Sequence, residues 1–476
     1  MDSATTQSLL STLSASKYES LLRRPNYWTS DPAHLLSTCD ISDVLIGTGA
    51  NIYSSLQSAL ESTESELVLV TCFWARSASL DTLCATLRHL SAKSLSRGGS
   101  KIRVRICVSS VSLWQKLFHT QSLEGYIYPP FTWEVKLGLP PPNELTGLDL
   151  QIKSIFVKPF SVMHPKFIII DRQKVFLPSC NVSWEDWFEG CIGLSGDVVH
   201  RFVEFWEDFW RGAESIREIP GLNGRHLAKG KPSFVLNHSE NRKSTDLPTL
   251  TNLRSTESPC VFLPSPHNIN PKFRLPWQSA VPAPNTPLNT FLLAAFRAAR
   301  RNIYIQTPNL TAPPVLLAIL QTLKRGIHIH IVTSERLMII EQLVTAGTTT
   351  SRCVSKLVKR YGRARHDGSL PHYSTVAVEE GRAQTMGHLK VEYYRPTATP
   401  RPRGQGGEPV QSHLKLTIVD DELVVLGSGN LDRASWYTSQ ELGIAIFEAE
   451  LAVQIRRVLD EVLDPRKSLF YDSRGV

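Results

Sequence analysis

Residues 164–171 read HPKFIIID, in which a lysine follows a histidine at the second position and an aspartate follows it at the seventh. In a β-strand, residues i and i+2 point to the same face. The apolar run between Lys166 and Asp171 is typical of a buried strand. The spacing therefore predicts that His164 and Lys166 project together, which places an imidazole beside a fixed positive charge.

The same pattern recurs at residues 413–420, HLKLTIVD. Ten residues after the aspartate of each copy comes an asparagine, which closes PSCN at 178–181 and GSGN at 427–430. A glutamate then follows in each half, Glu189 in FEGCIGL and Glu441 in QELGIAI. A third HLK, at 388–390, has Arg395 where the aspartate belongs and no matching asparagine, so we interpret His388 and Lys390 as structural.

The segments around the two motifs also correspond, which indicates one α/β unit used twice. Apolar runs at 66–74 and 302–310 predict buried strands, and each precedes a helical stretch that ends at glycine after basic residues. Strands before each motif and a helix after it complete the unit. We expect an N-terminal extension over 1–42, lobe 1 over 43–220, a polar linker or surface loop over 221–284, and lobe 2 over 285–476.

Composition limits the class of protein without naming it. Lysine plus arginine number 52 against 44 acidic residues, which mildly favours anionic ligands. The longest apolar runs are too short to span a bilayer, and the N-terminus lacks the features of a signal peptide. The eight cysteines are scattered without a CxxC, so we expect buried, reduced thiols in an intracellular protein, either cytoplasmic or peripheral to a membrane.

Two histidines brought together by duplication can divide the work of phosphodiester chemistry. One, neutral, attacks phosphorus, and the other, protonated, donates to the leaving oxygen and later takes a proton from water or an alcohol. Further groups complete the expected site, with no metal or cofactor: Lys166 and Lys415 for the non-bridging oxygens, Asn181 and Asn430 as amide donors, Glu189 and Glu441 as acceptors from the histidines. Asp171 and Asp420, at an odd offset, we expect to be structural.

These residues resemble the phospholipase D superfamily, whose motif is His-x-Lys-x4-Asp followed by Gly-Ser-x-Asn and a glutamate. The resemblance implies two duplicated lobes, each a mixed β-sheet flanked by helices, with one active site at the pseudo-twofold seam. It implies metal-independent catalysis through phospho-histidine, with His164 as nucleophile, His413 as acid/base, and Ser179 and Ser428 contacting substrate. Pro178 departs from the glycine of the motif.

Two substrate classes stay open at this point. The first is phospholipid at a membrane surface, by hydrolysis or phosphatidyl transfer, because residues 303–332 look like cardiolipin-synthase-type members with their Thr-Pro turn at Thr307-Pro308. Aromatic residues behind the motifs are candidates to line an acyl-chain entrance: Trp184, Trp187, Phe188 and Trp436. The second class is nucleic acid, for a nuclease or end-processing enzyme, because basic clusters occur at 300–302, 355–365 and 401–404. With both motifs in one chain, we expect a monomer to be competent.

Overall fold

The computed structural model describes residues 3–16, 31–110, 125–155, 162–208, 255–265, 282–366, 385–398 and 407–475. The basic cluster at 401–404 and most of the expected linker lie outside these ranges. Among the described residues, none of the helices combines the length and the apolar character needed to cross a bilayer.

Strands from both halves of the chain form one continuous mixed sheet, and the fold is α/β as predicted. Hydrogen-bonded neighbours follow the order β4-β5-β3-β2-β6-β7-β8-β1-β9-β16-β15-β14-β10-β11-β12-β17. The strands of the first half are β1 (Leu36–Gly47), β2 (Glu66–Phe73), β3 (Ile102–Ser110), β4 (Tyr126–Ile127), β5 (Leu148–Ser154), β6 (Phe167–Ile170), β7 (Lys174–Pro178) and β8 (Trp187–Ser195). Those of the second half are β9 (Ser255–Ser265), β10 (Asn302–Thr307), β11 (His328–Thr333), β12 (Leu389–Tyr394), β13 (Gln411–Ser412), β14 (Leu416–Val419), β15 (Leu423–Gly427), β16 (Glu441–Phe447) and β17 (Lys467–Asp472).

The two halves have the same order and direction of strands. In the first, β2, β3 and β5 are parallel, while β6, β7 and β8 continue the sheet antiparallel. In the second, β10, β11 and β12 are parallel, while β14, β15 and β16 continue it antiparallel. The predicted strands on either side of both motifs are therefore present.

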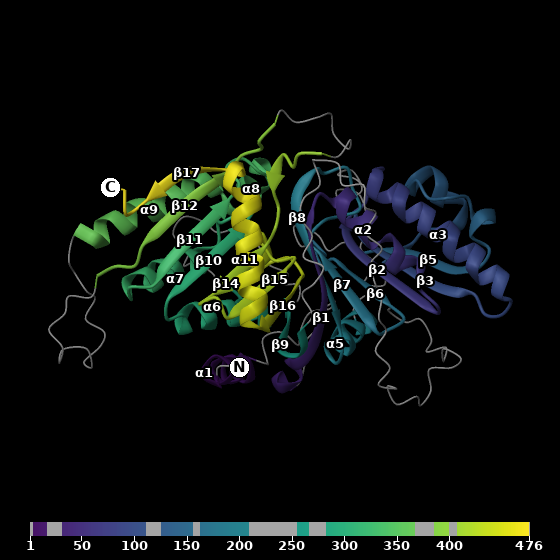
Figure 1. Cartoon of the computed structure of the whole chain (residues 1–476), viewed down its shortest axis with the longest axis horizontal. Helices are drawn as coiled ribbons and strands as arrows, with labels where there is room; N and C mark the ends of the chain where they lie inside the picture. Colours follow the sequence, from purple (N-terminus) through teal and green to yellow (C-terminus); the bar gives the residue numbers. More distant parts are fainter. Residues whose placement is uncertain are drawn as a thin grey trace.

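The expected linker is wrong for residues 255–265, which form the buried strand β9. This strand pairs antiparallel with β16 on one side and with β1 on the other, so β9 holds the same place in the second half that β1 holds in the first. Pro259 and Pro264 explain why the segment reads as a loop, because proline normally interrupts a central strand. The pairing of β1 with β9 joins the halves, which lie side by side along the long axis of the molecule in Figure 1.

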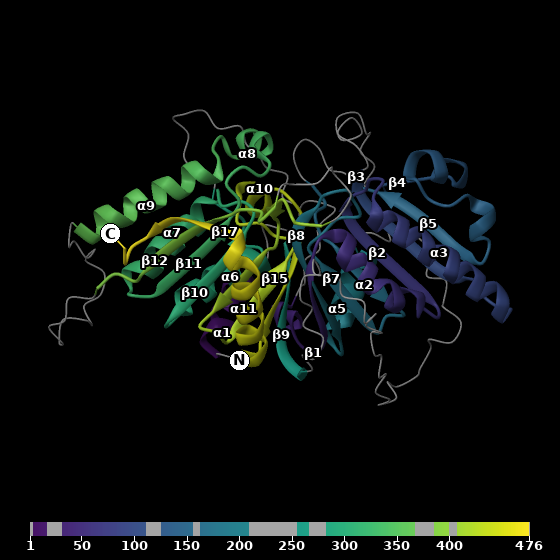
Figure 2. The same cartoon turned by 45° about the horizontal axis from the view of Figure 1, so that its top comes forward.

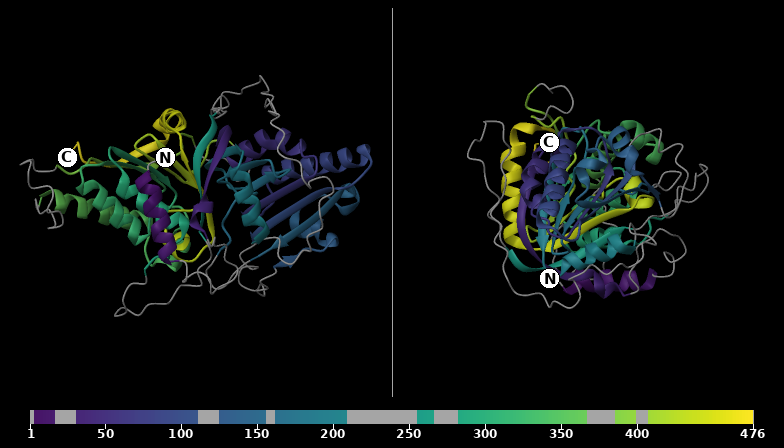
Figure 3. Two further views of the ribbon diagram at one scale, coloured as in Figure 1. Left: turned by 90° about the horizontal axis from the view of Figure 1, so that it is seen from below. Right: turned by 90° about the vertical axis from the view of Figure 1, so that its right-hand side faces the viewer.

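The expected N-terminal extension is also part of the folded body. Strand β1 begins at Leu36, and helix α1 (Ser3–Ser16) packs on α6 of the second half, with Leu13 buried. The views in Figure 3 place α1 over the second half, far from the sheet of the first. The start of the chain therefore crosses from one half to the other.

Helices cover both faces of the sheet in each half. In the first half α2 and α3 pack on one face and α5 on the other, while in the second half α6 and α7 lie opposite α11 (Figures 1 and 2). The helix bounds are α2 (Gly49–Glu61), α3 (Ala78–Arg97), α5 (Val198–Trp206), α6 (Pro287–Ala298), α7 (Pro313–Lys324), α8 (Ile339–Ala346), α9 (Thr350–His366), α10 (Arg433–Tyr437) and α11 (Ala449–Leu463). Helix α3 follows the predicted stop signal and ends at Gly98, whose φ is 59°.

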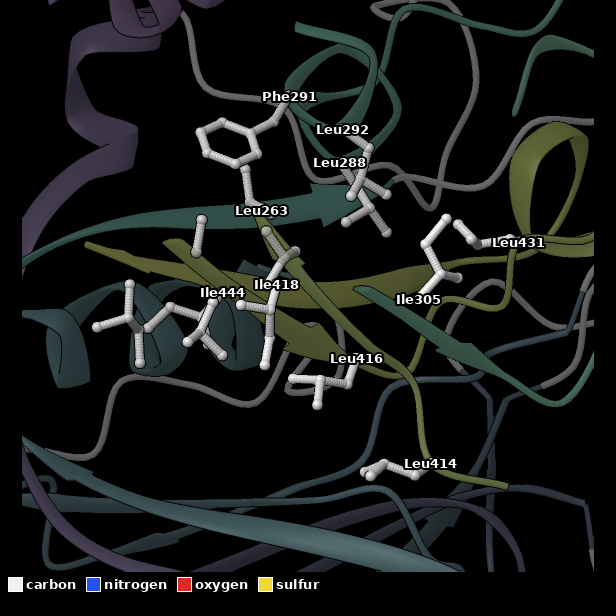
Figure 4. Packing of buried hydrophobic residues seen from close by; sticks show 14 of the residues in the cluster. Leu263, Leu288, Phe291, Leu292, Ile305, Leu414, Leu416, Ile418, Leu431 and Ile444 are labelled. Atoms are coloured by element: carbon white, nitrogen blue, oxygen red, sulfur yellow. The ribbon is translucent and has the colours of Figure 1, made fainter. Parts of the chain in front are cut away.

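One hydrophobic core extends through both halves. It contains Val44 and Ile192 of the first half together with Leu263, Leu414 and Ile444 of the second. Figure 4 shows Leu414 directed away from the other labelled side chains, toward the strands of the first half. Leu414 follows His413 directly, so this packing fixes the second motif against the opposite half.

The aspartates of the two motifs begin tight turns. Asp171 and Arg172 have φ of 50° and 55°, and Asp420 and Asp421 have φ of 55° and 57°. Two consecutive positive φ values between antiparallel strands define a type I′ hairpin turn, where aspartate is one of the favoured residues. The motif aspartate therefore suits the turn at the end of β6 and β14 that is far from the histidine.

Each of these carboxylates also accepts backbone hydrogen bonds from the chain that enters a neighbouring strand. Asp171 accepts from the N–H groups of residues 64, 65 and 66 at 2.7–2.9 Å. Asp420 accepts from those of residues 300, 301 and 302 at 2.7–3.0 Å. These bonds attach the hairpin after each motif to the start of β2 or β10, which is the structural role expected for an aspartate outside the site.

We predict that Asp171→Asn lowers the free energy of unfolding by about 1.5–3 kcal/mol, because it replaces a charged acceptor of several backbone N–H groups by a neutral amide. Asparagine tolerates the left-handed backbone, so the turn itself is preserved. Denaturant unfolding measures the change, and Asp421→Asn, at the second position of the equivalent turn, is the control with a smaller effect. Unaltered unfolding together with abolished activity would contradict the structural role.

Candidate active site

The backbone places each motif histidine against the other half of the chain. The His164 N–H donates to the carbonyl of Gln440 at 3.0 Å, and the His413 N–H donates to that of Phe188 at 2.9 Å. Gln440 and Phe188 are the residues just before Glu441 and Glu189. Short bridges on both sides, Met163 with Gln440 and β13 with the start of β8, extend these contacts. The two motifs thus meet at one seam.

The side chains pair across the same seam. His164 Nδ1 lies 2.9 Å from Glu441 Oε2, and His413 Nδ1 lies 2.7 Å from Glu189 Oε1. Each glutamate therefore serves the histidine of the opposite half. A carboxylate that accepts from Nδ1–H leaves the Nε2 lone pair for chemistry and fixes the tautomer.

The two motif serines, which were expected to contact substrate, form hydrogen bonds with the two glutamates. Ser428 Oγ donates to Glu441 Oε2 at 2.5 Å and accepts from the N–H of Leu442 at 3.0 Å. Ser179 Oγ does the same with Glu189 and the N–H of Gly190. A hydroxyl can donate one hydrogen bond, and in both serines the glutamate carboxylate accepts it. Ser435, which the sequence analysis missed, donates to the other oxygen of Glu441 at 2.6 Å.

Both lysines are buried and turned back toward their own histidines. Lys166 Nζ donates to the His164 carbonyl at 3.0 Å, and Lys415 Nζ donates to the His413 carbonyl at 2.7 Å. Lys415 Nζ also lies 2.8 and 2.9 Å from the two ring nitrogens of His413. Each ammonium therefore has protons left for an anion in the seam.

Burial governs the ionisation of this cluster. It lowers the pKa of Lys415 to about 7 and that of His413 to about 3, and it lowers the pKa of His164. Burial acts to raise the pKa of Glu189, but the adjacent His413 and Lys415 bring that pKa below its ordinary value. Lys415 acts electrostatically on His164, and Lys166 on His413, so the four groups form one unit. In the absence of an anion, both histidines are held neutral near pH 7.

The asparagines are held by acidic residues that the sequence pattern did not reveal. Asn181 Nδ2 donates to Glu185 at 3.1 Å, and Asn430 Nδ2 donates to Asp432 at 3.2 Å. Burial raises the pKa of both acids. An amide nitrogen has two protons, so each asparagine keeps one for a second acceptor. The acids stand four and two residues after their asparagines, and this unequal spacing gave no repeated signal.

Trp187 shields the second histidine. Its ring centroid lies 4.6 Å from that of His413, at the start of β8. Trp187 was expected among residues lining an acyl-chain entrance, and the structure places it directly on the site. Phe188 and Trp436 are buried in the core instead. His388 lies apart at the edge of the sheet, 2.6 Å from Asp472.

The described side chains include no group of three or more histidine, cysteine, aspartate or glutamate residues that is arranged to hold a metal ion. The arrangement offers two imidazoles with oriented Nε2 atoms, two ammonium groups and two amides around a seam. Such donors complement a phosphate diester, whose oxygens become more negative as a nucleophile attacks.

Part of the chain matches a known protein family. Residues 292–463 match a family described as cardiolipin synthase, PLD-like domain. No curated protein matches the chain. Phosphatidylserine synthase from Haemophilus influenzae Rd KW20 has a similar structure, with a TM-score of 0.51 and 12% identity over 91% of this chain and 89% of that one. Nuc, a phospholipase D family member from Salmonella typhimurium, matches with a TM-score of 0.26 and 18% identity over 38% of this chain and 90% of its own.

The second half of the chain carries the part that matches the PLD-like domain family, and this part includes the complete GSGN turn and the motif at 413–420.

We predict that sulfate, a dianion throughout the range tested, binds most tightly below pH 7. The anion raises the pKa of Lys415 above its value of about 7 in the empty site. Affinity should therefore weaken by up to about tenfold per pH unit from pH 7 to the raised value, and then level off. Calorimetric titrations between pH 6 and 9 measure this, and Lys415→Met should bind weakly and lose the part of the pH dependence that lies above pH 7. Constant affinity in the wild type would contradict the proposed charge state.

Proposed function

We propose that this protein is a phospholipase D-type enzyme that hydrolyses a phospholipid or transfers its phosphatidyl group, through a covalent intermediate on His164. The observation that carries the proposal is the pair of crosswise histidine–glutamate bonds, with two buried lysines beside them. Two oriented imidazoles serve a two-step displacement, in which one forms the covalent bond and the other moves protons.

His164 is the proposed nucleophile because its side chain is 16% exposed, against 2% for His413 under Trp187. Its Nε2 attacks phosphorus, and the bond to the leaving oxygen breaks as His413 gives that oxygen a proton. Water or an alcohol then loses a proton to His413 and attacks the phospho-histidine, which restores His164. The lysines and asparagines stabilise the non-bridging oxygens in both steps.

His413 must be protonated for the first step, yet its pKa in the empty site is about 3. A bound phosphate diester adds a negative charge beside the ring and raises this pKa. Binding of the substrate is therefore coupled to the uptake of a proton by His413. Glu189 accepts from Nδ1–H in either charge state and stabilises the imidazolium when it forms.

The matched family supports a phospholipid substrate, because its description names cardiolipin synthase. The Thr307-Pro308 turn lies beside the site, where the Thr307 hydroxyl accepts from the N–H of Leu431 at 3.3 Å. Leu431 directly follows Asn430, so this turn supports the second half of the site. The acceptor, water or alcohol, is decided by what reaches the seam after the first step.

The test uses His413→Asn with phosphatidyl-p-nitrophenol, whose leaving group needs little protonation. We expect one equivalent of p-nitrophenolate and a phosphatidyl adduct on the peptide containing His164, because the second step lacks its base. His164→Asn should give neither product. His388→Asn is the matched control, and it should turn over like the wild type.

An adduct on His413 in the His164→Asn protein would reverse the two roles. A parallel reaction with a p-nitrophenyl nucleotide diester tests the substrate class. Release of p-nitrophenolate from the nucleotide ester alone would show that the substrate class is nucleic acid and not phospholipid.

A further inference from the structure

Exposed apolar side chains gather in two short segments of the chain. The described residues include thirteen large apolar side chains that are exposed, and eight of them lie in residues 126–135 or on α8. Ile340 on α8 is 79% exposed, and Phe131 and Val135 are about as exposed, at 81% and 80%. The other five are Leu95, Leu317, Val453, Leu469 and Phe470. Contiguous apolar exposure of this kind marks an interaction site.

The two segments hold equivalent places in the two halves. Residues 126–135 belong to the connection from β3 to β5, and α8 belongs to the connection from β11 to β12. Each connection leaves its strand beside a motif. Ser109 Oγ accepts from the N–H of Met163 at 3.3 Å, and Ser334 Oγ donates to the Ser412 carbonyl at 2.8 Å. Figure 2 shows α8 and β4 along the upper edge of the molecule, with β8 between them.

A chain of hydrogen bonds connects the buried side of α8 to the active site. Gln342 Nε2 donates to Asn309 Oδ1 at 2.8 Å, and Gln342 Oε1 accepts from Thr350 at the start of α9. Asn309 Nδ2 in turn donates to Asp432 at 3.4 Å, and Asp432 also holds Asn430. Helix α8 therefore presents Ile340 and its neighbours to solvent at a fixed position relative to the site.

The charges around α8 indicate what covers it. Exposed cations stand before α8 and along the following helix, namely Arg336, Arg352, Lys356, Lys359, Arg360 and Arg363, while Glu341 is an exposed acid on α8 itself. An apolar helix face flanked by basic residues is the pattern of a segment that lies in the headgroup region of an anionic bilayer. Segment 126–135 adds exposed apolar side chains and one exposed acid, Glu134, and the exposed cation Lys136 follows it directly.

We propose that α8 and residues 126–135 form a docking surface for a bilayer that contains anionic phospholipid, and that this surface holds the seam against the membrane. The inference rests on the proposed function for its choice of occupant. The two apolar segments stand on either side of the site, so a substrate phosphate at the level of the headgroups enters between them.

The test is co-sedimentation with vesicles of phosphatidylglycerol and phosphatidylcholine, and it does not require turnover. We expect Ile340→Asp with Val344→Asp to weaken vesicle binding by about tenfold or more, and Phe131→Asp to weaken it independently. Leu317→Asp and Leu469→Asp replace exposed apolar residues outside both segments, and they should bind like the wild type. Hydrolysis of a water-soluble p-nitrophenyl diester should be unchanged in all of these variants, because none of the changed residues is in the site.

Equal binding by wild type and the α8 variant would overturn the proposal, as would a wild type that does not sediment with vesicles. A change of oligomeric state in the α8 variant, measured by light scattering, would assign the surface to a second copy of the chain instead. Vesicle binding that depends on α8 without turnover of any phospholipid would leave the docking surface standing and refute the proposed function. Turnover of phospholipid that does not depend on α8 would support the proposed function and refute the docking surface.

Discussion

The structure depends on two hydrogen bonds in which the histidine of each half pairs with the glutamate of the other half. Glu189 and Glu441 are almost completely buried, and each would be an uncompensated charge without the other half. Leaving a buried charged acceptor without its hydrogen-bond donor costs about 1–3 kcal/mol or more. The seam therefore has to close for the site to exist, and the pairing of β1 with β9, the crossing of α1 and the packing of Leu414 hold it closed.

Within this symmetric frame, small differences give the two histidines different tasks. His413 lies beneath Trp187 with a lysine across its ring, while His164 is more open and has no such cover among the described contacts. Among the described residues, Lys166 donates to the backbone carbonyl of its histidine, whereas Lys415 also lies near both ring nitrogens. The two halves supply two equivalent groups, and the surroundings of each one underlie the proposed division into nucleophile and proton carrier.

Local patterns in the sequence predicted most of the elements that carry the site. Alternation and apolar runs located β2, β6, β10 and β14, and glycine after basic residues located the end of α3. The sequence could not show that Glu441 serves His164, because a partner 277 residues away leaves no local spacing. Strand β9 was missed because Pro259 and Pro264 oppose a strand in isolation, and only pairing on both sides stabilises it. The hydrogen bonds of Ser179 and Ser428 to the glutamates were likewise not visible in the sequence, since their hydroxyl partners are set by the fold.

Nitrogen NMR of the histidine side chains reports directly on the crosswise pairing of histidines and glutamates. In the wild type, both rings should be protonated at Nδ1, because each donates to a glutamate. Glu441→Gln should change the spectrum of His164 and leave His413 as it was, and Glu189→Gln should change His413 alone. A change in the histidine of the same half, or in neither histidine, would contradict the account.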